Sequence, residues 1–301
     1  MQALSRGWSF LQQAWQMAFK DKDLIKPSIY ALVAGFFVSI IGLIPIVGAA
    51  FVFGESQIGN IIMFALGAIM IFVHYIVSYI FSAMTVYLIY GYLSEGDGRM
   101  DKAWAVVRRD VWDIASLAAA STVVNIIVGQ LRGARNRRGG AGLIGGALAG
   151  LIDTVWTEAA FLLLPAMVIE DINLSNALKR VGQITKNNLL LIGVSTVGVR
   201  WITGLIGTVL GLIGLVIALA VGGGLIAVAG GSTVSYVIGI ALGFFIFFTF
   251  VMVASIIGSY TGTAYHTCLY LWAREAEKAQ AAGKPISVAV APAPLAAVLG
   301  S

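Results

Sequence analysis

Six stretches of the chain are apolar for about the length that a helix needs to cross a bilayer, or for longer. That length is about 20 residues for a hydrocarbon core roughly 30 Å thick. Backbone groups in lipid must be paired within the protein, which leaves helices or a closed barrel. The stretches do not alternate apolar and polar residues as barrel strands do. The sequence therefore predicts an all-α fold, a polytopic transmembrane helical bundle with six spans at 24–53, 58–93, 114–131, 143–169, 189–229 and 234–272.

The composition agrees with a membrane protein and argues against several other classes. Hydrophobic residues make up 59% of the chain and charged residues 11%, whereas a soluble domain has about 25% charged residues. The first apolar stretch begins beyond residue 20 and exceeds the core of a signal peptide, so we expect it to stay in the protein. Two histidines and one cysteine argue against a zinc site, and we expect no metal and no cofactor.

Short amphipathic segments precede three of the apolar stretches. The segments at 101–110 and 175–181 lead into the third and fifth stretches. Such segments are typical of helices that lie in the membrane interface, so the sequence predicts three amphipathic interfacial helices. In the first, apolar residues at spacings of three and four share one helical face: Trp8, Leu11, Trp15 and Phe19.

This succession predicts a transmembrane domain over residues 1–273. It is built from three repeats of a surface helix and a helical hairpin, which start near residues 1, 100 and 173. Residues 274–301 form an Ala/Pro-rich cytoplasmic tail. The tail is either a flexible terminus or a docking strand, because 286–290 alternates like a strand.

Lysine and arginine predict the orientation. With six spans, fourteen of these residues fall on the side of the surface helices and both termini, and four fall in one loop on the other side, at Arg132, Arg135, Arg137 and Arg138. Positive charge marks the cytoplasmic side, so we expect a protein of the cell (inner) membrane with both termini in the cytoplasm. Anionic lipids at that face account for the positive charge, so we expect no nucleic-acid partner.

Two parts of this topology leave alternatives open. The stretch 114–131 is short and contains Ser121, Asn125 and Gln130, so it either spans or re-enters on the same side. The stretch 189–229 is long enough for one tilted span or for two. Candidate breaks near its end are the glycine-rich segments 222–224 and 230–232.

Ionisable residues inside spans are expensive and are functional candidates by default. Glu158 stands about 10 Å inside its span and Arg200 about 12 Å from the same side, at 1.5 Å per residue. An ion pair between them would serve either as a structural contact or as the lining of a polar path. Asp153 lies near the start of its span, and His74, near the middle of another, suits a helix contact better than a proton relay. His266 falls in a belt of aromatic residues and receives little functional weight.

Small residues four apart let helices approach closely in lipid. The sequence offers two such sets, which predict helix contacts either within one chain or between the subunits of a homo-oligomer. The first set is Gly142, Gly146 and Gly150, and the second is Gly207 and Gly211.

The chain resembles a family of uncharacterised prokaryotic polytopic membrane proteins, a domain of unknown function. The resemblance extends almost to Trp272, and it implies a helical membrane fold but no activity, substrate or catalytic residue. It rests on the segments 7–10, 20–24 and 177–180, on Gly96-Asp97, and on Pro165 near Glu170.

Function is narrowed mainly by what the sequence lacks. It has no phosphate-binding loop of the Walker type, no HExxH motif and no GxSxG nucleophile elbow. We therefore expect no enzyme and no catalytic residues. The sequence predicts a transporter or channel for a small solute or ion; the alternative is a membrane scaffold or assembly subunit that binds lipid or partner proteins.

Overall fold

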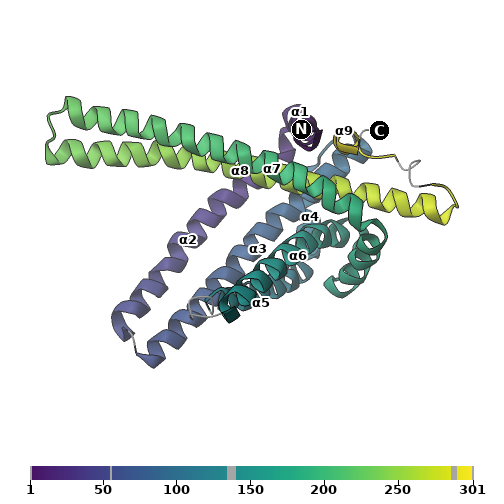
Figure 1. Ribbon diagram of the computed structural model, residues 1–301, viewed down its shortest axis with the longest axis horizontal. Helices are drawn as coiled ribbons and strands as arrows, with labels where there is room; N and C mark the ends of the chain where they lie inside the picture. The colour runs from purple at the N-terminus through teal and green to yellow at the C-terminus, as the bar shows by residue number, and fades with distance from the viewer. Residues whose placement is uncertain (1, 55, 134–139, 286–289, 300–301) are drawn as a thin grey trace.

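The structure is a computed structural model that describes residues 2–54, 56–133, 140–285 and 290–299. Within these ranges, the side chains of 2–4, 140–144, 185–201 and 297–299 lie outside the description. The described chain is helical (Figure 1), with the order α1 (Gln2–Lys20), η1 (Lys22–Leu24), α2 (Lys26–Phe53), α3 (Gln57–Glu95), α4 (Met100–Arg109), α5 (Val111–Gly133), α6 (Gly140–Glu170), α7 (Leu174–Val228), α8 (Thr233–Ala281) and α9 (Ala293–Leu299).

Six helical segments are long and apolar enough to cross a membrane, in agreement with the predicted all-α bundle of six spans. They are 22–53, 57–95, 111–133, 145–170, 202–228 and 233–281. Many apolar side chains on these segments face outward, which would be costly in water but is ordinary in lipid. The chain is therefore a multi-pass membrane protein.

The two open questions of topology have simple structural answers. Helix α5 is unbroken over 23 residues, or about 34 Å at 1.5 Å per residue, and so has the length of a span rather than of a re-entrant turn. Helix α7 holds one candidate span and passes through 222–224 without a break. The chain turns instead at Gly230 and Gly231, which have positive φ angles of 71° and 66° that glycine adopts at no steric cost.

The surface helices α1 and α4 bury one face each against the bundle. Helix α1 turns Phe10, Ala14 and Met17 inward at spacings of three and four, as an amphipathic helix does. Its Trp8 and Phe19 remain 47% and 73% exposed.

The segment expected as the third surface helix differs from the other two. Asn173 caps it by accepting a hydrogen bond from the Asn176 amide, and Ala177, Val181 and Ile184 form a buried stripe. However, it is the start of α7 and continues without a break into the following span. No glycine or proline lies between Gly182 and the apolar run that follows, so nothing there ends the helix.

Among the described residues, the main buried core lies at one end of the bundle. It joins α1, α4 and the adjoining ends of α3, α6 and α8, with Leu88, Leu163 and Tyr265 among its members. The hairpins α2–α3 and α7–α8 extend away from this core in different directions (Figure 1), and their far ends expose apolar residues such as Phe51 and Val228.

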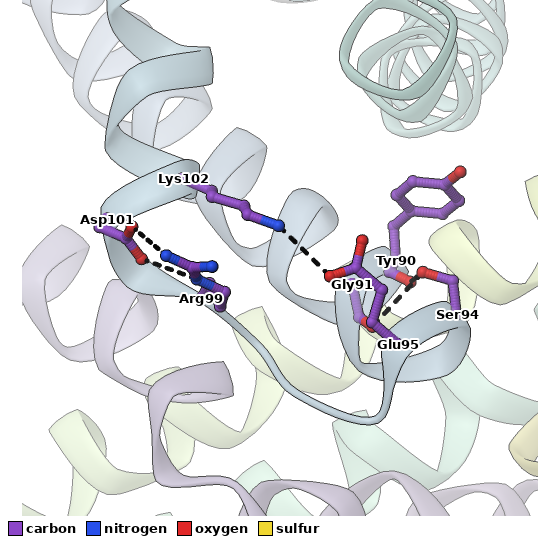
Figure 2. A network of polar contacts seen from close by, with 7 residues as sticks. All are labelled: Tyr90, Gly91, Ser94, Glu95, Arg99, Asp101 and Lys102. Carbon is purple, nitrogen blue, oxygen red and sulfur yellow. Dashed lines mark hydrogen bonds and ion pairs between the residues drawn. The ribbon is translucent and has the colours of Figure 1, made fainter.

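A corner of polar contacts connects α3 to α4. Gly96 ends α3 in the left-handed conformation, and Lys102 reaches back to Glu95 over 3.3 Å (Figure 2). In the same corner Arg99 donates to Asp101 at 2.8 Å, and this hydrogen bond lowers the pKa of the Asp101 carboxyl. On the other side of the loop, the Asp21 carboxylate accepts a hydrogen bond from the Gly98 amide at 2.7 Å.

The tail also returns to the bundle. Helix α9 packs against α1 and α8, and its Leu295 is fully buried. The segment 286–290 expected as a possible docking strand lies outside the described residues except for Val290, which is exposed. The docked part of the tail is thus a short helix.

Candidate functional site

The functional candidate best defined by the structure is a contact between α6 and α8 inside the bundle. Glu158 Oε2 of α6 lies 3.1 Å from His266 Nε2 of α8. The histidine side chain is 6% exposed and the glutamate side chain 25% exposed. An ionisable pair therefore lies within two of the helices that have the length and composition of spans.

Other groups hold the His266 ring in place. Its Nδ1 lies 2.7 Å from the carbonyl oxygen of Gly262, one turn earlier on α8. The ring of Phe161 stacks on the imidazole at 4.6 Å between centroids, and Tyr265 meets it edge-on at 5.2 Å. A ring fixed by a backbone carbonyl and two aromatic neighbours has little freedom to turn.

His266 is the residue that sequence reasoning undervalued. Its place in an aromatic belt favoured an interfacial role, but the structure makes it the described partner of Glu158. The position of a residue along the chain indicates its depth in a span. The rotation of each helix about its axis decides which neighbouring side chains the residue contacts. The available signal was that Glu158 needed a polar partner and that the chain has only two histidines.

Arg200, the expected partner of Glu158, has a side chain outside the described residues. Its backbone can still be placed by the pairing of the antiparallel helices α7 and α8. A Cβ on Gly258 would lie 3.7 Å from Thr203 Cγ2, so Arg200, about one turn before Thr203, runs beside α8 near the level of Gly262. The Glu158–Arg200 pair stays a prediction.

A second polar chain links α3, α5 and α6 within the same bundle. The Ser121 hydroxyl lies 2.7 Å from the Tyr79 hydroxyl and accepts a hydrogen bond from Trp156 Nε1 at 3.0 Å. Asn125 of α5 contacts the Tyr75 hydroxyl at 3.4 Å. These contacts satisfy polar groups that would otherwise be costly to bury.

The remaining predicted polar residues lie apart from the Glu158–His266 pair. Asp153 accepts a hydrogen bond from Arg132 at 2.5 Å, joining α6 to the end of α5, and both side chains are about half exposed. His74 Nε2 of α3 lies 3.2 Å from the Ser39 hydroxyl of α2. His74 therefore makes the kind of contact with a neighbouring helix that its position favoured.

The glycines predicted as helix contacts are open within one chain where their surroundings are described. A Cβ on Gly150, Gly207 or Gly211 would meet nothing within 4 Å. For Gly142 and Gly146 the close surroundings lie outside the described part of the chain. An intersubunit contact at these positions stays a prediction.

The close helix contact within the chain uses different small residues, along the α7–α8 hairpin. The backbones of Gly222 and Gly239 nearly touch, and a Cβ on Gly243 would lie 3.0 Å from the carbonyl oxygen of Ala218. Gly239 and Gly243 form a GxxxG step that the sequence analysis passed over. Gly222, the first residue of the segment 222–224 expected as a possible break, instead lies in this contact between α7 and α8, which we call the seam.

Charged residues gather at the core end of the bundle. The Arg180 guanidinium of α7 lies 3.0 Å from Glu170 and 2.6 Å from Glu277. Partial burial acts to lower the pKa of Arg180, but the hydrogen bonds to the two carboxylates outweigh it and raise the pKa above its ordinary value. Arg109 similarly contacts Asp110 and Asp171. These ion pairs join the ends of α4, α6, α7 and α8.

Comparison with known proteins adds no relative. No protein-family model matches the chain, and no curated protein or solved structure matches it either. Membership of the family that the sequence resembles therefore stays a prediction. Among the described residues, no group of three His, Cys, Asp or Glu side chains could hold a metal ion.

Proposed function

We propose that the protein moves a small solute or ion across the membrane through its helical bundle. The supporting observation is the Glu158–His266 pair, which lies between two membrane-spanning helices. Ionisable groups between the helices of a membrane bundle are costly and commonly mark ion or substrate pathways. An apolar contact between α6 and α8 would hold the helices together without that cost.

We further propose that the core end of the bundle faces the cytoplasm, with both chain ends on that side of a cell (inner) membrane. Support comes from the positive residues of α1, α4 and the start of α7, which lie at this end. The exposed Trp8 and Phe19 of α1 suit the interface, where aromatic rings concentrate and anionic lipids attract positive charge.

Vesicle flux tests the proposed transport function. Purified protein is reconstituted in vesicles that contain a dye for protons, sodium or potassium, and a gradient of each ion is applied in turn. We expect flux above protein-free vesicles for at least one ion, and its loss in Glu158→Gln. Glu95→Gln, at the exposed end of α3, is the matched control and should keep the flux. Equal flux from all three proteins would contradict the proposal.

A second function, a membrane scaffold or assembly subunit, is favoured by the α7–α8 hairpin. No Asp, Glu, Lys or Arg occurs between Ile202 and Ala273, and the far part of the hairpin exposes apolar residues such as Leu219 and Phe244. A second copy of the chain could cover this surface and form a homo-oligomer. Light scattering in detergent measures the oligomeric state and, with the vesicle assay, distinguishes the two functions. A persistent oligomer without ion flux favours the scaffold.

A further inference from the structure

We infer that Glu158 and His266 together bind one proton between Oε2 and Nε2, and that this proton is the ion whose binding drives movement through the bundle. The first half of the inference depends only on the geometry of the pair. The second half rests on the proposed transport function. The experiments below test the two halves separately.

Counting hydrogens around the imidazole leads to the shared proton. Nδ1 lies 2.7 Å from the Gly262 carbonyl oxygen, which can only accept, so Nδ1 must carry a hydrogen. A neutral imidazole has one N–H, which would leave Nε2 as a bare acceptor. An ionised Glu158 carboxylate is also acceptor-only, yet its Oε2 lies 3.1 Å from Nε2. Two acceptors at that distance repel, so a second proton lies between them.

That proton can reside on either atom without changing the charge of the pair. On Nε2 it gives an imidazolium beside a carboxylate, and on Oε2 it gives a neutral imidazole beside a carboxylic acid. Both forms have a net charge of zero. A neutral pair is the cheapest way to keep two ionisable groups between the helices of a membrane bundle.

Loss of the proton would change the charge of the pair among closely packed aromatic neighbours. Phe161 covers one face of the imidazole, and the titratable Tyr265 lies edge-on to it. From α7, Arg200 passes near the level of Gly262, as the pairing of Thr203 with Gly258 indicates. When the proton leaves to water, the pair changes from zero to one negative charge, and two lone pairs then face each other across α6 and α8.

Loss of the proton therefore removes the hydrogen bond between the two helices and adds repulsion in its place. A ligand shifts a conformational equilibrium when it binds one state better than the other. The arrangement with α6 and α8 in contact at this level holds the proton between two atoms, and therefore binds it more tightly than an arrangement in which Glu158 and His266 are apart. Proton binding and release would thereby favour two different arrangements of the bundle.

Nitrogen NMR of the two histidines tests the shared proton. In a His74→Gln background, ¹⁵N-histidine labelling leaves His266 as the single histidine signal. In lipid at about pH 7, we expect Nδ1 to carry a hydrogen, together with either a protonated Nε2 or an infrared band of a carboxylic acid. A bare Nε2 without a carboxylic acid band, or a bare Nδ1, would overturn the inference. This measurement needs no substitution in the pair itself.

Glu158→Gln provides the matched comparison. A glutamine amide can donate to Nε2, so the second proton is no longer needed, and we expect a bare Nε2 with Nδ1–H retained. Histidine ordinarily changes charge between about pH 5 and about pH 8. At a pH in this range where the parent holds the pair proton, the variant should hold one proton fewer than the parent. Equal proton uptake by the two proteins would count against the shared proton.

Vesicle flux then tests the coupling half. With the shared proton established, we expect a proton gradient to drive dye-detected proton movement that Glu158→Gln abolishes. If the spectra show the proton but vesicles show no proton flux, the coupling is overturned while the proton site stands. If another ion moves, its flux is lost in Glu158→Gln and it is indifferent to the proton gradient, the transport proposal stands and the coupling is again overturned.

Discussion

Gly222 of α7 and Gly239 of α8 approach each other so closely that neither position has room for a side chain. A Cβ on Gly222 would lie 2.5 Å from the Gly239 carbonyl oxygen, and a Cβ on Gly239 would lie 2.6 Å from that of Gly222. Because the obstacle in each case is backbone, it cannot swing aside as a flexible side chain can. Small residues at such contacts are what let helices pack in lipid, where no hydrophobic force drives them together.

We predict that Gly222→Ala destabilises the hairpin by about 1 to 3 kcal/mol, the usual cost of overpacking. Gly223→Ala is the matched control, since a Cβ there meets nothing within 4 Å. Both changes raise helix propensity equally, so their difference isolates the contact. Thermal unfolding of the purified variants in detergent measures it, and equal losses would contradict the role of the seam.

Arg180 should be worth more to stability than its neighbour Lys179. Arg180→Met leaves Glu170 and Glu277 without their shared cation, and we expect a loss of about 1 to 3 kcal/mol. This is below the cost for a fully buried pair, because the three side chains are 22–23% exposed and water screens them partly. Lys179→Met, at an exposed position, should change the unfolding temperature little. A similar effect from both variants would argue against the ion-pair cluster.

The proposed topology predicts which side of the membrane labels each loop. In a Cys268→Ala background, Lys284→Cys should react with an impermeant reagent only from the cytoplasmic side, and Ser56→Cys only from the other side. The positive-charge bias of the loops is the physical reason. Labelling of position 284 from outside would overturn the orientation, whereas labelling of both positions from one side would overturn the number of spans between them.

The expected pair of Glu158 and Arg200 remains open to a direct test. Removing one partner should reduce folded yield more than removing both, because the survivor is left as a lone charge in the membrane. We therefore expect Glu158→Gln and Arg200→Gln to be less stable than the double variant, with a coupling of about 0.5 to 3 kcal/mol. Detergent-solubilised yield and melting temperature provide the readout. Simple additivity of the two losses would show that the residues do not interact.

The spans could be predicted from the sequence because run length and backbone pairing decide them almost alone. In the case of α5, the polar residues Ser121 and Asn125 made re-entrance possible. The structure shows that neighbouring helices satisfy both: Ser121 contacts Tyr79 and Trp156, and Asn125 contacts Tyr75. Such partners come from other parts of the chain, so local sequence could not reveal them.

The candidate site was less predictable for the same reason. Depth estimates identified Glu158 as a residue in need of a partner, but they could not show that α8 turns His266 toward it. The glycine motifs had a similar limit. Gly207 and Gly239 both belong to small-residue steps, yet only the second is described in a close contact, because the crossing of α7 and α8 places the seam near the hairpin tip.

The packing of α1 bears on how the protein is made. Trp15 and Ala14 form hydrogen bonds with Thr261 and Tyr260, partners that lie 246 residues further along the chain. At about 5 to 20 residues per second, synthesis of that interval takes roughly 12 to 50 seconds. During this time several spans enter the membrane, and the inner face of α1 has not yet made its contacts with α8. Helix α1 therefore leaves the ribosome well before its partners on α8, and a membrane surface that binds α1 during this interval would keep its inner face out of water.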